Sequence, residues 1–295
     1  MSDRDVTSYF IASIPLALAH LCIPPVSSLA LIPELPPEPL QPLFKFLYDI
    51  APPVMQDSNF VYSLMLLQKG SKKLQNVDHR LFTHLFVHAT YGHMLGNLAQ
   101  CVLNGYPVFR HFGPTGFYLL FLSGGIFGSI NAQLLFSNWL STFKSDKNPA
   151  PASLFGIKLP TIRGIVNTLT SAIGIEPTFL CCGSSGAVFT LYGSSMVLSV
   201  RNLVRDVLLL SRYKQDRGKA GKILLRILRD LPFYLSFIMV VSKELMGAEQ
   251  QQQIQSDFFS WISATSVTGH TSHLDGMLFG MGITALSLIP GVLSH

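Results

Sequence analysis

The sequence is short of charge. Only 13% of its 295 residues are Asp, Glu, Lys or Arg, whereas a soluble globular chain carries about 25% charged residues. Hydrophobic residues make up 48% of the chain, and phenylalanine alone occurs 21 times. This composition excludes the pair of soluble domains that the length alone would suggest. It predicts a single polytopic domain embedded in a lipid bilayer.

Other features are also scarce or missing. The net charge of +5 is modest, and the basic residues lie mainly between apolar runs, so nucleic acid is not an expected partner. The first apolar run lacks a clear cleavage site and is not expected to be a cleaved signal peptide. Cysteines in apolar stretches more often pack as small hydrophobic side chains than form disulfides, so they do not indicate the redox compartment. The four are Cys22, Cys101, Cys181 and Cys182.

Long apolar runs are what the sequence has instead. A bilayer core about 30 Å thick requires about 20 apolar residues per helix. Six segments reach or approach that length, so the predicted fold is an all-α bundle of six transmembrane helices. Pro24 and Pro25 fall inside the first segment and can kink it or end it early. The six segments are roughly 8–32, 90–110, 114–136, 178–200, 226–246 and 272–293.

Three long connections separate these spans. They cover residues 33–89, 137–177 and 247–271. The aromatic stretch 44–67 in the first is too broken by proline and polar residues to span, so it is expected to lie in the membrane interface. The glutamine run from Gln250 to Gln253 is expected to be a flexible, solvated turn.

The distribution of lysine and arginine predicts the orientation. The segment 201–229, between the fourth and fifth spans, holds nine of the 21 basic residues. The positive-inside rule places such a segment in the cytosol. Six spans then place both termini in the cytosol and the three long connections on the opposite side.

Ionisable side chains inside a bilayer are costly, so each one is a functional hypothesis. The second span contains His93 and Asn97, which are four residues apart and share a helical face. His84 and His88 form a similar pair in the segment that leads into this span. A lone histidine there favours an interfacial or helix-capping role. His93 together with Asn97 favours function.

The fourth span opens with Gly-x-Ser-Gly, formed by Gly183, Ser185 and Gly186. A serine beside glycines can be approached closely by a substrate backbone. A helix that starts there leaves free backbone N–H groups able to bind an oxyanion. Small residues also occur where membrane helices touch, so the motif taken alone favours a packing role over catalysis.

The sixth span begins near His273. Gly276 and Gly280 follow it at the four-residue spacing that lets two membrane helices approach closely. If the neighbour is the fourth span, His273 comes close to Ser185. The nearby His270 is assigned no role.

Together these residues suit acyl transfer. A serine hydroxyl needs a base, and a histidine is suited to accept its proton. The Asn97 amide, an N–H of His93 and the Ser185 backbone N–H are candidate oxyanion donors. Asp275 lies two residues after His273 and points about 200° away on a helix. The prediction is therefore a Ser–His dyad and not a triad.

The order, spacing and placement of these motifs on the second, fourth and sixth spans resemble the rhomboid family of intramembrane serine proteases. The resemblance covers roughly residues 75–293. We therefore divide the chain into 1–74, the first span and the start of an interfacial loop, and 75–295, the protease core. The residues that carry the resemblance are Arg80, His84, His88, His93, Asn97, Gly183, Ser185, Gly186, His273, Gly276 and Gly280.

The resemblance implies Ser185 as nucleophile and His273 as base. It implies that His93 and Asn97 stabilise the oxyanion, with Gly183 beside them. The implied substrates are transmembrane segments of other membrane proteins, cut from the non-cytosolic side. No cofactor and no metal are expected, and the sequence indicates neither an oligomeric state nor a particular membrane. The residues expected to support the site are Phe189, Arg80, His88, Gly276 and Gly280.

The sequence departs from the family pattern at four places. Phe189 stands where members often have a tyrosine stacked on the catalytic histidine, so the ring is kept and the hydroxyl is lost. His79 stands where a tryptophan often precedes the arginine, and Asp275 where a small residue is common. The connection 137–177 is long. These departures affect substrate choice more than chemistry.

Three other functions remain as alternatives. One is an inactive rhomboid relative that binds membrane clients, although such relatives typically lack the serine or the histidine. A second is a haem or metal protein that uses His84, His88, His93 and His273. His84-Leu-Phe-Val-His88 lacks the glutamate of His-Glu-x-x-His, and metal binding would leave Ser185 unexplained. A third is a transporter whose flux survives replacement of Ser185.

Overall fold

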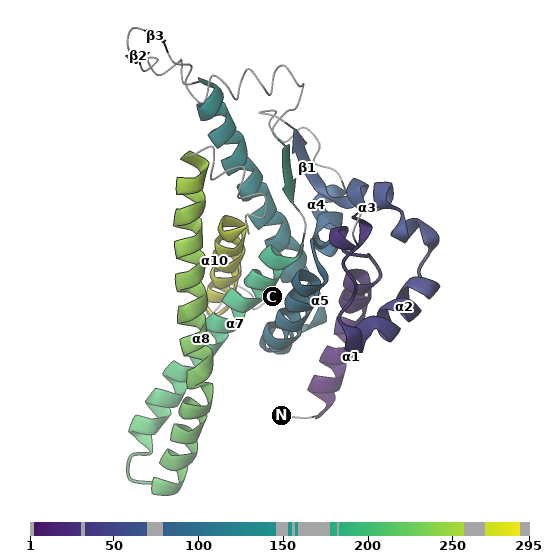
Figure 1. Ribbon diagram of the computed structural model, residues 1–295. Coiled ribbons are helices and arrows are strands. Elements are labelled where there is room, and N and C mark those ends of the chain that lie inside the picture. The colour runs from purple at the N-terminus through teal and green to yellow at the C-terminus, as the bar shows by residue number, and fades with distance from the viewer. Residues whose placement is uncertain are drawn as a thin grey trace.

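The computed structural model describes residues 3–30, 33–69, 79–145, 153–154, 157–158, 178–181, 183–256 and 269–289. Its described part is a bundle of helices with a few short strands, which confirms the predicted all-α class (Figure 1). The long helices are α1 (Asp3–Leu21), α5 (Tyr91–Ser145), α7 (Ser185–Arg212), α8 (Arg217–Ser256) and α10 (His270–Ser287).

The helix α5 breaks at one glycine. Gly113 has φ of 71° and ψ of −177°, which lie outside the helical region. Glycine adopts a positive φ without a Cβ clash, and the proline that follows removes a backbone donor. The break falls between the predicted spans 90–110 and 114–136, so α5 contains both.

Among the described residues, length and hydropathy identify fewer candidate membrane spans than the six predicted. Three described segments qualify, namely Val6–Leu29, Tyr91–Ile130 and Ser185–Arg212. The predicted count of six is therefore not confirmed. The first half of α8 carries many charged residues, and α10 begins with a polar turn that contains His270, His273 and Asp275.

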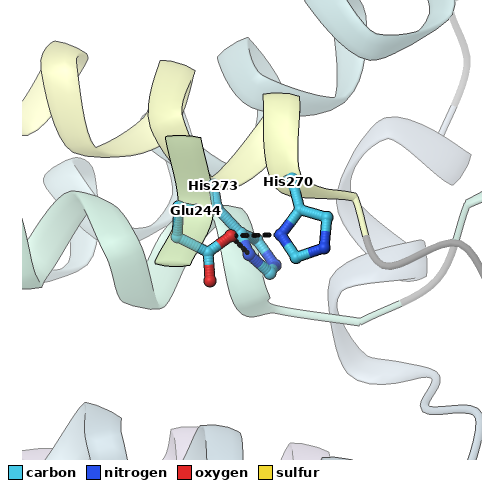
Figure 2. Close-up of side chains that lie close together, drawn as sticks. All are labelled: Glu244, His270 and His273. Carbon is cyan, nitrogen blue, oxygen red and sulfur yellow. Dashed lines mark hydrogen bonds and ion pairs between the residues drawn. The ribbon is translucent and has the colours of Figure 1, made fainter. Parts of the chain in front are cut away.

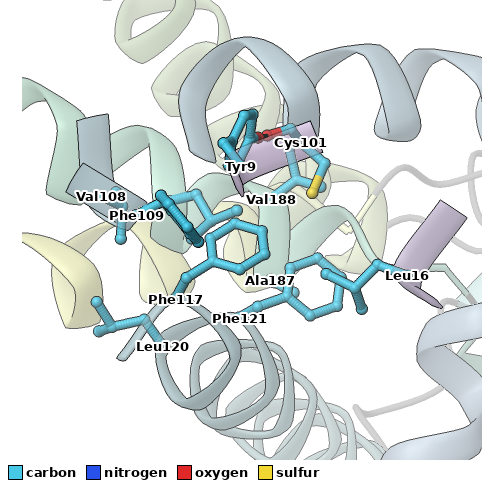
Figure 3. Packing of buried hydrophobic residues seen from close by; sticks show 11 residues of the cluster. Tyr9, Leu16, Cys101, Val108, Phe109, Phe117, Leu120, Phe121, Ala187 and Val188 are labelled. Atoms are coloured by element: carbon cyan, nitrogen blue, oxygen red, sulfur yellow. Dashed lines mark hydrogen bonds between the residues drawn. The ribbon is translucent and has the colours of Figure 1, made fainter. Parts of the chain in front are cut away.

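A hydrophobic core lies where α1, α5 and α7 meet (Figure 3). Tyr9 of α1 is buried in it, and its hydroxyl donates to the carbonyl oxygen of Cys101 in α5 at 2.9 Å. Lipid tails are as apolar as these side chains, so close packing and such hydrogen bonds hold membrane helices together. The cluster consists of Tyr9, Leu16, Cys101, Val108, Phe109, Phe117, Leu120, Phe121, Ala187, Val188 and Leu191.

Glycines bring α7 and α10 into backbone contact. A Cβ built on Gly276 would lie 2.2 Å from the carbonyl oxygen of Gly186, and one on Gly280 would lie 2.0 Å from that of Thr190. On the other side of the contact, a Cβ on Gly193 would lie 2.3 Å from the carbonyl oxygen of Met277. The last helix therefore packs against the serine helix, as its glycine spacing predicted.

The helices α7 and α8 continue beyond the bundle as a hairpin, at the lower left of Figure 1. With 28 residues, α7 is about 42 Å long, which exceeds a bilayer core of about 30 Å. Asp216 caps α8 by accepting a hydrogen bond from the Lys219 N–H at 3.0 Å. Arg226 pairs with the buried Asp206 at 3.0 Å. This hairpin carries the basic segment that predicts the cytosolic side.

The first connection contains short elements at the right of Figure 1. In α2, Phe44 and Leu47 are buried, whereas Leu43, Phe46 and Ile50 are exposed. An exposed apolar face of this kind suits the predicted position in the membrane interface. The elements are α2 (Gln41–Ile50), α3 (Ser58–Leu64), β1 (Leu66–Lys69) and α4 (Arg80–Thr83).

One predicted span boundary is wrong and another is refined. The first span, expected over 8–32, qualifies over Val6–Leu29, and its helix α1 ends at Leu21, before the proline pair that was expected to kink it or end it early. The fourth span was expected from residue 178, but β4 (Thr178–Cys181) pairs antiparallel with β1. Apolar residues suit a paired strand as well as a helix, so the apolar run alone could not separate them.

The predicted connections are also shorter than expected. The helix α5 continues to Ser145, and α8 continues to Ser256. The run from Gln250 to Gln253 is thus helical and not a turn, because glutamine is a good helix former. The rest of the predicted connections 137–177 and 247–271 lies mostly outside the described residues. Within them, β2 (Ser153–Leu154) pairs with β3 (Ile157–Lys158).

Candidate active site

Ser185 is the first residue of α7 and lies two residues after a glycine with a positive φ. Gly183 has φ of 102°, and a Cβ built on it would lie 2.6 Å from Cε1 of His93. Only glycine allows this backbone conformation so close to the His93 ring. The first N–H groups of α7 lack partners within the helix, so the serine turn can offer them to an anionic oxygen.

The first connection supports the serine turn through His84. The Gly183 N–H donates to the His84 carbonyl oxygen at 2.9 Å. The His84 ring donates from Nδ1 to the Arg80 carbonyl oxygen. Its Nε2 lies 2.7 Å from the hydroxyl oxygen of Ser129 in α5. Burial lowers the pKa of His84 to about 4, so its ring is neutral. Arg80 and His84 thus belong to the scaffold that holds the turn.

His88 does not pair with His84 as predicted. A short 3₁₀ turn, η4 (His84–Phe86), and the extended residue Val87 separate them, so the two rings do not share a helical face. His88 lies beside the serine turn instead. Its ring centroid is 5.4 Å from that of His93, and its Nε2 is 3.4 Å from the Ser184 hydroxyl.

A buried histidine of α1 completes this group. The His20 ring donates from Nδ1 to the Leu16 carbonyl oxygen, so its Nε2 accepts from the Ser184 hydroxyl at 2.9 Å. The serine oxygen is then free to accept from Nε2 of His88. His20 was not among the predicted site residues, although an ionisable residue inside the first apolar span was a sufficient signal.

His93 and Asn97 lie on the first turns of α5. The Thr90 hydroxyl accepts from the His93 backbone N–H at 3.0 Å and so caps the helix. The Asn97 side chain is 8% exposed, and its Nδ2 has no hydrogen-bond partner among the described residues. A buried amide donor without a partner is uncommon, because its desolvation is costly.

His273 stacks on Phe189. The two ring centroids are 4.3 Å apart and the ring planes differ by 4°. Phe189 lies one turn after Ser185 on α7, so the stack places His273 over the same face of α7 as the serine. The departure from tyrosine at this position therefore preserves ring stacking.

Glu244 of α8 binds the ring of His273. Its Oε2 accepts from Nδ1 of His273 at 2.8 Å and from Nδ1 of His270 at 2.6 Å (Figure 2). Glu244 and His273 are both buried. The expectation that no acidic residue holds His273 is thus wrong, because a helix distant in sequence supplies one. A carboxylate inside the predicted fifth span was the missed signal.

The structure brings several of the predicted residues together. Gly183 lies against the His93 ring, and Phe189 stacks on His273. Among the described residues, Ser185 and His273 share no hydrogen bond. The arrangement therefore holds Ser185 at the start of α7 and, stacked on the same helix one turn later, a buried imidazole fixed by a carboxylate.

The comparisons with known proteins identify the family. A family model described as the Rhomboid domain matches residues 76–289. No curated protein and no solved structure is significantly similar to the chain. The match covers most of the sequence and includes α4, α5, α7, α8 and α10, together with every predicted site residue. The chain therefore belongs to the rhomboid family and is an integral membrane protein.

Proposed function

We propose that this chain is an intramembrane serine endopeptidase with Ser185 as nucleophile and His273 as general base. The observation that carries the proposal is the stack of His273 on Phe189, one turn after Ser185. It sets a buried imidazole over the serine end of α7. A hydrogen bond between the catalytic serine and histidine is often long in a free enzyme and tightens when substrate binds.

The hydrogen bond to Glu244 assigns the protons of His273. A carboxylate accepts, so Nδ1 of His273 carries the ring proton and Nε2 keeps its lone pair. Nε2 is therefore the atom that takes the Ser185 proton. Glu244 acts as a positioning residue, since it fixes the tautomer and stabilises the imidazolium that forms during attack.

The reaction then follows the usual course of acyl transfer. The Ser185 oxygen attacks the scissile carbonyl while Nε2 of His273 accepts its proton. The imidazolium next donates this proton to the leaving amine, and the acyl group stays on Ser185. Water attacks the acyl group with His273 again as base, which releases the second product and the free serine.

The developing oxyanion needs donors that are already in place. We assign the Asn97 Nδ2 to this task, because it is buried and lacks a hydrogen-bond partner among the described residues. An N–H of His93 and the Ser185 backbone N–H at the start of α7 are the other donors. A substrate oxygen held there would satisfy the Asn97 donor that the free chain leaves unpaired.

The substrates are transmembrane segments of other proteins, which is the substrate class of the family. We place the site on the non-cytosolic side, because the basic hairpin of α7 and α8 extends from the opposite end of the serine helix. Small residues that loosen a helix are the expected cleavage positions.

The test is cleavage of a transmembrane reporter by purified protein in detergent, with Ser185→Ala and His273→Ala as variants. The proposal predicts cutting by the wild type and loss of cutting in both variants. Cutting that persists in Ser185→Ala contradicts the nucleophile. If folded wild type cuts none of a panel of reporters and its Ser185 takes up no serine-directed label, the chain is an inactive, client-binding member of the family.

A further inference from the structure

Two histidines and a carboxylate converge on one point at the end of α10. Oε2 of Glu244 lies 2.6 Å from Nδ1 of His270 and 2.8 Å from Nδ1 of His273. These three ligand atoms all lie within 4.8 Å of one another. Figure 2 shows both rings turned toward the same carboxylate oxygen. The cluster joins α8 to α10.

Positioning of the catalytic ring explains only part of this cluster. Orientation of His273 needs one carboxylate and one imidazole. His270 makes its contact to the Glu244 oxygen one turn before His273 on the same face of α10. It has no role in the proposed acyl transfer. The second imidazole is therefore the feature that calls for another function.

We propose that Glu244, His270 and His273 form a Zn²⁺ site that switches the protease off. Two imidazole nitrogens and one carboxylate oxygen are a recognised zinc ligand set, with the fourth position left for water. Zinc bonds to these atoms are about 2.0–2.2 Å long, so neighbouring ligand atoms lie about 3.3 Å apart. To admit the ion, the contact of Glu244 with His270 must lengthen by about 0.7 Å and that with His273 by about 0.5 Å.

The path to the site is short. Glu244 and His273 are buried, but the His270 side chain is 17% exposed and lies at the first turn of α10. Zinc therefore meets His270 first and then reaches the two inner ligands. The ion comes from the water on the side of the membrane where the active site opens.

Inhibition follows from the ring chemistry and rests on the proposed function. A neutral imidazole that binds zinc through Nδ1 carries its proton on Nε2. The ring proton moves from Nδ1 to Nε2, so no proton is gained or lost by the ring. His273 then donates from Nε2 and cannot accept the Ser185 proton. Zinc also replaces the hydrogen bonds between α8 and α10 with metal bonds.

Direct binding is measured first, so that the result does not depend on activity. Chelator-treated protein in detergent competes with a chromophoric chelator for Zn²⁺. The proposal predicts one tight equivalent in the wild type and in Ser185→Ala. It predicts affinity at least about tenfold weaker in His270→Ala, since one of the three protein ligands of the ion is lost. The matched control is His111→Ala. His111 lies on α5 and contacts Ser287 at the end of α10, so this variant should keep the wild-type affinity.

Cleavage is then compared within each protein before and after Zn²⁺ is added. Zinc should inhibit the wild type, a chelator should restore cutting, and His270→Ala should need at least about tenfold more zinc for the same fractional loss. Absence of one tight equivalent, or equal affinity in His270→Ala, overturns the proposed site. Stoichiometric binding without inhibition of an active wild type overturns the switch. Zinc binding by Ser185→Ala tests the metal site even if the chain has no protease activity.

Discussion

Replacing Asn97 should slow cleavage without lowering the stability of the fold. Its buried Nδ2 has no hydrogen-bond partner among the described residues, so Asn97→Ala removes a desolvated donor without breaking a bond through that atom. The melting temperature in detergent should stay the same or rise. The turnover of a transmembrane reporter should fall by about 100- to 1000-fold, as for other oxyanion donors.

Gln100 of the same helix provides the control for Asn97. It is exposed, and its side-chain oxygen accepts a hydrogen bond from Asn104. Gln100→Ala should therefore leave turnover within a factor of about two. If Asn97→Ala lowers the melting temperature and turnover together, the side chain has a structural role and the oxyanion assignment is wrong.

Glu244 should influence the rate and not substrate affinity. Glu244→Gln keeps a similar shape but removes the negative charge that holds the Nδ1 proton of His273. Loss of the correct tautomer should lower kcat by at least about tenfold with little change in KM. Asp230→Asn on α8, at an exposed ion pair with Arg229, is the matched control. A changed KM with an unchanged kcat would assign Glu244 to substrate binding.

His84 should make the fold sensitive to acid. Burial lowers its pKa from 6.5 to about 4, so between these pH values the unfolded chain binds a proton that the folded chain does not. The contribution of neutral His84 to the stability of the fold is therefore fully present above about pH 6.5 and is lost as the pH drops toward about 4. A shift of this size corresponds to about 3 kcal/mol.

The test is the melting temperature of the wild type and of His84→Gln at pH 7 and pH 5. The glutamine side chain at position 84 cannot take up a proton, so the melting temperature of the variant should fall less between the two pH values. His79→Gln, at an exposed histidine just before α4, should behave like the wild type. If the melting temperature falls equally in all three proteins, His84 is not the source of the acid sensitivity.

At the scale of elements, the contact between α7 and α10 sets the site. Gly280→Ala places a Cβ about 2.0 Å from the Thr190 carbonyl oxygen, which is backbone and cannot move aside. Such overpacking costs about 1–3 kcal/mol, and the shift of α10 should also weaken cleavage. Gly282→Ala meets nothing within 4 Å and should be neutral or slightly stabilising. Equal melting temperatures for the two variants would show that this contact is not tight.

Some of the contacts between these elements could be predicted from the sequence and others could not. The helical spacing of Gly276 and Gly280 predicted a close partner for α10, because small residues at that interval mark membrane helix contacts. No local pattern could predict that Glu244 reaches His273, since that contact depends on how α8 packs beside α10. The strand β4 was missed because its pairing partner β1 lies far away in sequence.

At the scale of the whole molecule, the apolar runs predicted a helical membrane protein and the motifs predicted its family. The composition could not predict where helices end, because α7 and α8 extend well past their apolar parts. The buried group of His20, Ser184 and His88 also depends on tertiary packing, since it joins α1 to the serine turn. Such a group forms only when three distant segments fold together.

The central claim is that Ser185 is a nucleophile activated by His273. It is tested most directly by labelling purified protein with a fluorophosphonate and mapping the modified residue by mass spectrometry. The account predicts an adduct on Ser185, its absence in Ser185→Ala, and labelling at least about 100-fold slower in His273→Ala. Ser184→Ala should still be labelled on Ser185. An adduct on Ser184, or unchanged labelling in His273→Ala, would contradict the account.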